Sequence, residues 1–384
     1  MPDLVLTEEE RMLQAAVREF ADRELAPRAR ECDEKEEFSW ENWSGMASLG
    51  LTGIGIDPEY GGIGGGYRQM AIAEEEVARG DAATSVTLVA HASLATATIY
   101  KFGDEEQKLE FVPPLARGEK LGAWALTEPG CGSDAAALQT TATPRDGAYV
   151  LNGSKIFITN GDVAEHIVVF ATEDKGLGSR GISAFIVDRE TPGFQVHKQP
   201  GKLGMRGSST TELVFQDAPV PRSNRLGEKG SGFRYAMEVL NSSRIIIAAQ
   251  CVGIGQAALE AAIRYSQQRR TFGQPIAQHQ AIQFMLADMA TEIYASRVAT
   301  MHAATLKDNH LPFIKEASMA KLLASEMAVS VSSKALQVHG GYGYFKDSPV
   351  ERYFRDARAT TIYEGTSEMQ RLIIAGQLLS QHTL

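Results

Sequence analysis

The sequence predicts a multi-domain protein of α and β type, in which an N-terminal α-helical domain precedes a β domain and a C-terminal helical bundle. Three observations lead to this prediction. The 384 residues exceed what one hydrophobic core normally supports. Apolar residues recur at helical spacing towards both ends of the chain, whereas the middle consists of short β-branched and aromatic runs. We place the domains at residues 1–120, 121–232 and 233–384.

The first domain is predicted to begin with an amphipathic helix. One apolar face is formed by residues at positions i, i+3, i+4 and i+7, namely Leu13, Ala16, Val17 and Phe20. Thr7 and Glu10 have the spacing of a capping box that opens this helix. A glycine-rich break follows at residues 57–66, and helical patterning resumes over residues 71–79 and 84–100.

The second domain is predicted from short apolar runs that are separated by turn residues. The runs are residues 149–151, 155–159, 166–170, 182–187 and 212–215, and the turns include Asn152–Gly153, Asn160–Gly161 and Pro192–Gly193. About six short strands without intervening helices indicate a small antiparallel sandwich or barrel.

The third domain is predicted as a four-helix bundle of long helices with short connections. One apolar stripe consists of Ile282, Met285, Leu286, Met289 and Ile293, and another of Ala320, Leu323, Ala324, Met327 and Val331. The most apolar segment, residues 245–263, contains Gln250, Gln256 and Glu260. A membrane span of about 20 residues would rarely include three such groups, so we interpret the segment as a buried helix.

Composition excludes several classes of protein. A formal net charge of −10 disfavours nucleic acid as a partner. The three cysteines, Cys32, Cys131 and Cys251, are too few and too scattered for a disulfide framework, and no Cys or His spacing indicates a metal site. The acidic start of the chain (Asp3, Glu8, Glu9, Glu10) does not fit a targeting segment. We therefore expect a cytoplasmic protein that does not insert into membranes.

The glycine-rich segments do not predict a nicotinamide enzyme of the Rossmann type. Gly61–Gly66 neither fits GxGxxG nor lies between a strand and a helix, and GxxxxGK[ST] is absent from the sequence. Loop and turn glycines are the simpler interpretation.

Five other stretches carry more information. They are residues 124–134 (WALTEPGCGSD), 157–161 (FITNG), 269–273 (RRTFG), 337–343 (QVHGGYG) and 362–368 (IYEGTSE). In this order and spacing they resemble the acyl-CoA dehydrogenase family, and the resemblance extends over residues 5–378. It implies an N-terminal helical domain, a middle β domain and a C-terminal four-helix bundle, which agrees with the three periodicities.

The resemblance implies FAD as the cofactor, extended between the β domain and the bundle and reaching a neighbouring subunit. The family's contacts to the flavin ring correspond here to Trp124, Ala125, Leu126, Thr127, Ser133, Phe157, Ile158 and Thr159. Contacts to the remainder of FAD correspond to Arg269, Thr271, Phe272, Gln280, Gln337, Val338, His339, Gly340, Gly341, Thr366, Ser367 and Glu368. Many relatives have tryptophan where this chain has Phe157. An arginine suits the pyrophosphate because its planar fork binds phosphate oxygens bidentately.

The resemblance also implies that Glu364 is the catalytic base. It would remove the α-proton of an acyl-CoA thioester while a hydride passes from the β-carbon to FAD, which gives a trans-2-enoyl-CoA. Substrate contacts correspond to Ser133, Asn241, Ser242, Ser243, Arg244 and Gly365. Asn241 replaces the aspartate of many relatives. A carboxylate that is desolvated beside the flavin gains the basicity that this proton transfer needs.

The family further implies a homotetramer built as a dimer of dimers, an electron-transfer flavoprotein as the electron acceptor, and a role in fatty-acid β-oxidation. Glutaryl-type members carry an arginine where this chain has Ser85, so a monocarboxylic acyl chain of short or medium length is preferred. Isovaleryl-type members place their base at the position of Ser243.

Two alternatives remain open from the sequence. A flavin oxidase with the same fold would pass its electrons to oxygen, and reoxidation rates in air with and without an electron-transfer flavoprotein would distinguish it. A non-enzymatic CoA-binding scaffold would not show bleaching of its flavin by an acyl-CoA. The presence of Glu364 and of the flavin motifs disfavours the scaffold.

Overall fold

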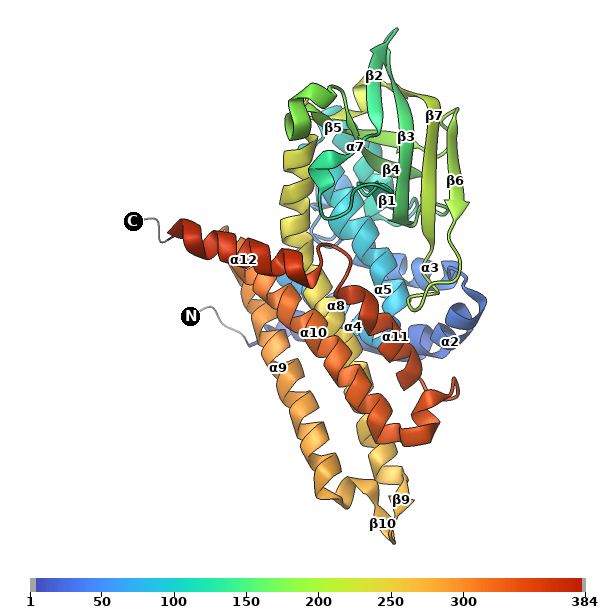
Figure 1. Ribbon diagram of the computed structural model, residues 1–384, viewed down its shortest axis with the longest axis vertical. Coiled ribbons are helices and arrows are strands. Elements are labelled where there is room, and N and C mark those ends of the chain that lie inside the picture. Colours follow the sequence, from blue (N-terminus) through green and yellow to red (C-terminus); the bar gives the residue numbers. More distant parts are fainter. Residues whose placement is uncertain (1–4, 382–384) are drawn as a thin grey trace.

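The computed structural model describes residues 5–381. The four residues before and the three residues after this range, which include Asp3, lie outside the described residues. Figure 1 shows the β domain at one end of an elongated molecule and a short hairpin, β9 (Arg270–Thr271) and β10 (Gln274–Pro275), at the other end. Long helices connect the two ends.

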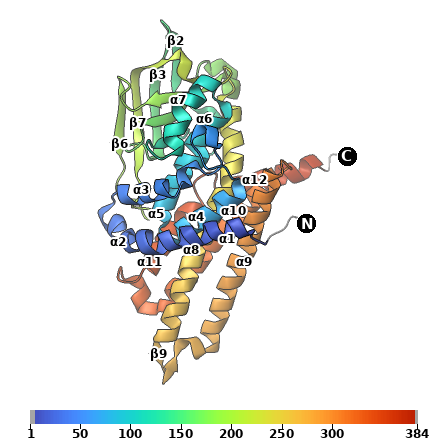
Figure 2. The same cartoon turned by 180° about the vertical axis from the view of Figure 1, so that it is seen from behind.

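The N-terminal domain is helical, as predicted. Its helices are α1 (Glu8–Phe20), α2 (Ala26–Lys35), α3 (Trp40–Ser48), α4 (Tyr67–Gly80), α5 (Ala82–Leu88), α6 (Ala97–Phe102) and α7 (Glu105–Ala116). π-Helical turns join α1 to α2 and α5 to α6. Thr7 and Glu10 form the predicted capping box. Val17 is buried, but Ala16 is exposed, because the buried stripe of α1 is narrower than the pattern indicated. In Figure 2, α1 lies in front, beside α4, against which it packs.

The middle domain consists of β1 (Gly122–Ala125), β2 (Thr141–Arg145), β3 (Ala148–Thr159), β4 (His166–Thr172), β5 (Ile182–Asp188), β6 (Phe194–Lys198), β7 (Thr210–Pro221) and β8 (Arg225–Leu226). The strand order is β6-β7-β3-β2-β4-β5-β8, and β1 pairs with β4. Most pairs are antiparallel, as predicted, but β4 pairs in parallel with β1 and β2. Only Thr141 and Thr172 join β2 to β4, so the sheet divides there into two halves. Leu151 and Phe215 from one half share a core with Ile167 and Phe185 from the other.

One predicted turn is wrong. Asn152–Gly153 lies inside β3, where the pairing with β7 shifts register between Leu151 and Gly153. Gly153 has a φ of 142°, and a Cβ on it would lie 2.6 Å from Thr140 Oγ1. The glycine therefore marks a β-bulge at a close approach of the chain rather than a hairpin. The turns at Asn160–Gly161 and Pro192–Gly193 occur as predicted.

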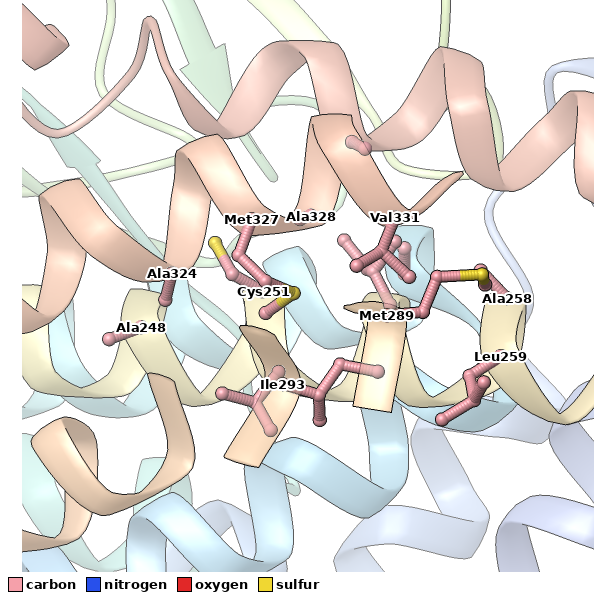
Figure 3. Close-up of a cluster of buried hydrophobic side chains, with 14 of the residues drawn as sticks. Ala248, Cys251, Ala258, Leu259, Met289, Ile293, Ala324, Met327, Ala328 and Val331 are labelled. Carbon is pink, nitrogen blue, oxygen red and sulfur yellow. The ribbon is translucent and has the colours of Figure 1, made fainter. Parts of the chain in front are cut away.

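The C-terminal domain contains α8 (Gly232–Gln268), α9 (Gln280–Asp308), α10 (Ile314–His339), α11 (Val350–Thr360) and α12 (Ser367–Gln381). The hairpin of β9 (Arg270–Thr271) and β10 (Gln274–Pro275) joins α8 to α9. Figure 3 shows how Met289 and Ile293 from α9, Met327 and Val331 from α10, and Cys251 from α8 pack together. Leu323, which was predicted to belong to a buried apolar stripe, is exposed instead.

Within residues 5–381, two helical runs are long and apolar enough to cross a membrane by length and composition, namely Ala82–Phe102 and Gly232–Gln268. In each run, 89% of the most apolar window is buried inside the protein. This burial is typical of core helices, and it agrees with the interpretation of residues 245–263 as a buried helix.

Candidate active site

Glu364 lies in the short loop between α11 and α12, and its backbone is left-handed. Its φ is 51°, and that of Gly365 is 93°. A non-glycine residue rarely adopts this conformation, and such strain is typical of functional sites. The positive φ of Gly365 favours glycine at that position, and a Cβ there would lie 2.7 Å from Gln370 Nε2 and displace that side chain. The turn aims the Glu364 side chain towards α8.

Three side chains hold this loop. Lys321 Nζ donates a hydrogen bond to the Gly365 carbonyl at 2.8 Å, and Gln370 Nε2 donates to the same oxygen at 2.9 Å. The Tyr363 hydroxyl donates to Gln250 Oε1. Sequence reasoning missed Lys321, whose side chain is fully buried. The sequence pattern that could have revealed Lys321 is its position four residues after the buried Ala317, which places this lysine on the buried face of α10.

Helix α8 supplies the other side of the site. Ser243 Oγ donates to Glu364 Oε2. Arg244 is buried and donates to Asn241 Oδ1 at 2.6 Å, and its Nε has no hydrogen-bond partner among the described residues. The Ser242 hydroxyl donates to the carbonyl of Glu238. Ser243 and Arg244 therefore act on Glu364 directly, and Asn241 is joined to the site through Arg244.

Burial raises the pKa of Glu364 to about 7. The hydrogen bond from Ser243 and the charges of Lys321 and Arg244 act in the opposite direction. Some of the Glu364 side chain stays accessible to solvent. The carboxyl group can therefore change its protonation state near neutral pH, which a general base requires.

The predicted flavin contacts of the β domain differ in exposure. Phe157 lies at a second register shift in β3, with a φ of 59° and 67% exposure, so the bulge turns its ring outwards. Trp124 is partly exposed, and its Nε1 donates to Thr98 Oγ1 at 3.2 Å. The side chains of Ala125, Leu126 and Ile158 are buried in the cores, so only their main chain can meet a ligand. Thr127 and Thr159 are partly exposed, and Ser133 is exposed.

A second group of predicted cofactor residues surrounds a cavity of about 650 Å³ at the far end of the bundle. Arg269, Thr271, Val338, His339, Gly340 and Gly341 line it. A Cβ on Gly340 or Gly341 would meet no atom within 4 Å, so the bare backbone of both glycines faces open space. Phe272, at the tip of the hairpin, is 96% exposed. Gln280 and Gln337 are also exposed and do not line the cavity.

The Glu364 loop and the cavity are far apart within one chain. Lys321, which bonds the Glu364 loop, and Val338, which lines the cavity, lie on the same helix seventeen residues apart. At 1.5 Å per residue this separation is about 25 Å. Thr366, Ser367 and Glu368 open α12 beside Glu364, where the Ser367 hydroxyl donates to Glu326 Oε1 at 2.6 Å.

Both groups have the chemistry that a flavin nucleotide needs. The cavity combines a guanidinium group with glycine backbone, which suits a phosphate-bearing group that must approach the main chain closely. The exposed aromatic ring of Phe157 suits a planar ring system. A buried carboxyl group with a raised pKa completes the features of a flavin-dependent oxidoreductase that removes a proton from carbon.

Comparison with known proteins agrees with this class. The chain matches the acyl-CoA dehydrogenase N-terminal domain over residues 7–119, the middle domain over residues 123–218 and the C-terminal domain over residues 230–379. It is 48% identical to the human mitochondrial short-chain specific acyl-CoA dehydrogenase, covering 98% of this chain and 92% of the relative.

Two solved structures are similar over nearly their whole length. Butyryl-CoA dehydrogenase from Megasphaera elsdenii has a TM-score of 0.96 and 45% identity, covering 98% of this chain and all of that one. A chain in the structure described as the electron transferring flavoprotein of Acidaminococcus fermentans has a TM-score of 0.97 and 46% identity, covering 98% and 99%. The protein belongs to the acyl-CoA dehydrogenase family, whose members are FAD-dependent oxidoreductases.

The raised pKa of Glu364 predicts how stability depends on pH. A carboxyl group whose pKa is raised by folding stabilises the protein fully below its ordinary pKa of 4.5, and this stability is lost as pH rises through about 7. Glu364→Gln removes the cost of ionisation, so we expect a gain of about 1–3 kcal/mol over wild type at about pH 9. Urea unfolding across pH measures it.

Glu368→Gln is the matched control, because Glu368 is exposed in the first turn of α12, four residues after Glu364, and its pKa is lowered by hydrogen bonds from its own backbone and Thr366. This substitution should bring no gain at high pH. A difference between wild type and Glu364→Gln that does not change with pH would contradict the titration of Glu364.

Proposed function

We propose that this enzyme oxidises a short-chain acyl-CoA to the trans-2-enoyl-CoA, with Glu364 as the base that removes the α-proton. The observation that carries the proposal is the Glu364 carboxyl group itself. It is desolvated enough to be basic, it is held by Ser243, and it faces the cations of Arg244 and Lys321. Bound FAD supplies the acceptor for the hydride that leaves the β-carbon.

The surrounding residues prepare this proton transfer. The hydrogen bonds from Lys321 and Gln370 to Gly365 fix the loop, so that Glu364 can approach the α-carbon without rearrangement. When the carboxylate takes up the proton, its negative charge disappears from the buried site, which desolvation favours. The backbone N–H of Glu364 is proposed to stabilise the charge that develops on the thioester oxygen.

A short monocarboxylic acyl chain is the substrate that the site favours. Ser85, at the position where glutaryl-type members carry arginine, is fully buried and donates a hydrogen bond to Glu74. A second carboxylate on the substrate would therefore meet an acidic side chain instead of a cation. The relatives named as butyryl-CoA and short-chain dehydrogenases support the same substrate class.

An electron-transfer flavoprotein is proposed as the electron acceptor, supported by the similarity to a chain from such a structure. We also propose that the enzyme is a homotetramer, that it lies in the cytoplasm, and that it acts in fatty-acid β-oxidation. The separation of about 25 Å between the Glu364 loop and the cavity supports assembly, since the hairpin of one subunit can complete the FAD site of another. The exposed ring of Phe272 fits such a contact.

The role of the base is tested with Glu364→Gln. The amide keeps the shape of the side chain but cannot accept the proton, so acyl-CoA should still bind while flavin reduction falls by more than about a thousandfold. Stopped-flow absorbance of the flavin measures the rate. Glu110→Gln, on the exposed surface of α7, is the control and should reduce at the wild-type rate. Reduction of Glu364→Gln within about tenfold of wild type would exclude Glu364 as the base.

The hydrogen bond between Ser243 and Glu364 predicts that a base can also act from α8. Proton removal requires only a carboxylate within reach and with a suitable pKa. Glu364→Gly combined with Ser243→Glu should therefore recover part of the flavin reduction that Glu364→Gly loses. Recovery should be incomplete, because a displacement of about 1 Å can reduce the rate on the order of a hundredfold. Equal rates in the single and double variants, with substrate affinity intact, would contradict it.

Arg269 connects cofactor binding with assembly. Arg269→Ala should lower the FAD content per chain and weaken the tetramer together, because the proposed role of the guanidinium group is completed across a subunit boundary. Flavin absorbance and analytical ultracentrifugation measure the two effects. Arg270→Ala is the matched neighbour, since the Arg270 side chain donates to the Gly273 carbonyl of its own hairpin. A fully active, FAD-loaded monomer of the wild type would contradict the proposed assembly.

A further inference from the structure

A series of buried hydrogen bonds leads away from the loop that carries Glu364, between α11 and α12. The Tyr363 hydroxyl donates to Gln250 Oε1, Gln250 Nε2 donates to Ser85 Oγ at 2.8 Å, and Ser85 Oγ donates to Glu74 Oε1. Gln250 and Ser85 are fully buried, and Glu74 is 2% exposed. The series joins the loop before α12 to α8, α5 and α4, and it ends in a carboxyl group that the proposed proton transfer does not use.

Glu74 lines a small cavity that is otherwise almost entirely apolar. The cavity holds about 20 Å³, roughly the space of one water molecule. Its other lining side chains include Ala73, Leu88, Val89, Ala92 and Ile246. Glu74 is therefore the one carboxyl group among the residues that line this space.

The cavity lies about one turn of α8 from the contact between Ser243 and Glu364. Ser243 contacts Glu364, and Ile246 follows three residues later on the same face of α8. Three residues of helix rise about 4.5 Å, so a substrate whose α-carbon meets Glu364 could reach the cavity with a short acyl chain. Tyr363, at the other end of the hydrogen-bond chain, is the neighbour of Glu364.

A buried carboxyl group without a cation is neutral more readily than ionised. No ion pair to Glu74 occurs within residues 5–381. The pKa of Glu74 is raised to about 8, because burial and, to a smaller extent, the negative charge of Glu364 outweigh the hydrogen bond from Ser85, which lowers it. A neutral carboxylic acid can stand in an apolar cavity because Ser85 satisfies one of its oxygens.

We propose that Glu74, anchored through Ser85 and Gln250, is the end wall of the acyl-chain site and the residue that limits the length of the substrate. The inference rests on the proposed function, and it names the residue that limits the depth of the acyl-chain site. An aliphatic wall can repack around a longer chain. A hydrogen-bonded wall yields only by leaving buried polar groups unpaired, which lowers reaction with the longer substrate about ten- to hundredfold.

The test compares kcat/KM for butyryl-, hexanoyl- and octanoyl-CoA in the holoenzyme. Glu74→Ala opens the wall, so the ratio of octanoyl-CoA to butyryl-CoA should rise at least about tenfold. Glu74→Met keeps the volume but removes the anchor, so it should raise the ratio less. Glu74→Gln keeps both the volume and an acceptor for Ser85, and its ratio should stay near that of wild type.

Glu75→Ala is the matched control. Glu75 is the next residue of α4, is also buried, and pairs with Arg297 at 2.8 Å without lining the cavity. This substitution should lower the melting temperature without changing the preference for chain length. A shift equal to that of Glu74→Ala would show that general disturbance of α4 is responsible, and it would overturn the proposal.

Binding measured without turnover separates this inference from the proposed function. In a Glu364→Gln background, the affinity for octanoyl-CoA relative to butyryl-CoA should rise on adding Glu74→Ala. An unchanged ratio in both Glu74→Ala and Glu74→Met, or an equal loss at every chain length, would overturn the inference. A wild type that binds butyryl-CoA but does not oxidise it would overturn the proposed function, while the affinity ratios still test the wall.

Discussion

The organisation of the site depends on one constraint, which is that a carboxyl group must lose most of its contact with water and still be reachable by a substrate. Desolvation alone would keep Glu364 protonated, and nearby cations alone would make it too weak a base. The structure balances the two by burying the side chain while Lys321 and Arg244 lie near it. The left-handed turn, the close approach at Gly365 and the buried lysine on α10 all serve this balance.

Much of the architecture could be predicted from the sequence, because it follows from local rules. The capping box at Thr7, the change from helical to strand periodicity and the buried character of residues 245–263 depend on neighbours within a few positions. Asn152–Gly153 shows where local rules fail. The same dipeptide can form a hairpin turn or a bulge, and the contact that distinguishes them here is with Thr140, the residue just before β2.

The site shows a similar division. The position of Glu364 and the two sets of cofactor residues came from motifs, and the structure places Ser243 and Arg244 beside Glu364. Lys321 and Glu74 were not predicted, because charged side chains on helices usually face solvent. Their burial depends on partners about 44 and 11 residues away, Gly365 and Ser85, which no pattern along the chain connects. The order of the motifs along the chain gives no distances. The separation between the Glu364 loop and the cavity therefore became evident only in the three-dimensional structure.

Helix α8 has a consequence for how this protein can vary. It carries Ser243 and Arg244 beside the catalytic loop and ends just before Arg269 at the far cavity, with no break over its 37 residues. Because each residue turns a helix by about 100° and advances it about 1.5 Å, one inserted or deleted residue would rotate one site relative to the other by more than a quarter turn. The length of helix α8 therefore fixes both the distance and the relative orientation of the two sites. Changes of length should be tolerated in surface loops such as that between β5 and β6, while α8 can change only by substitution.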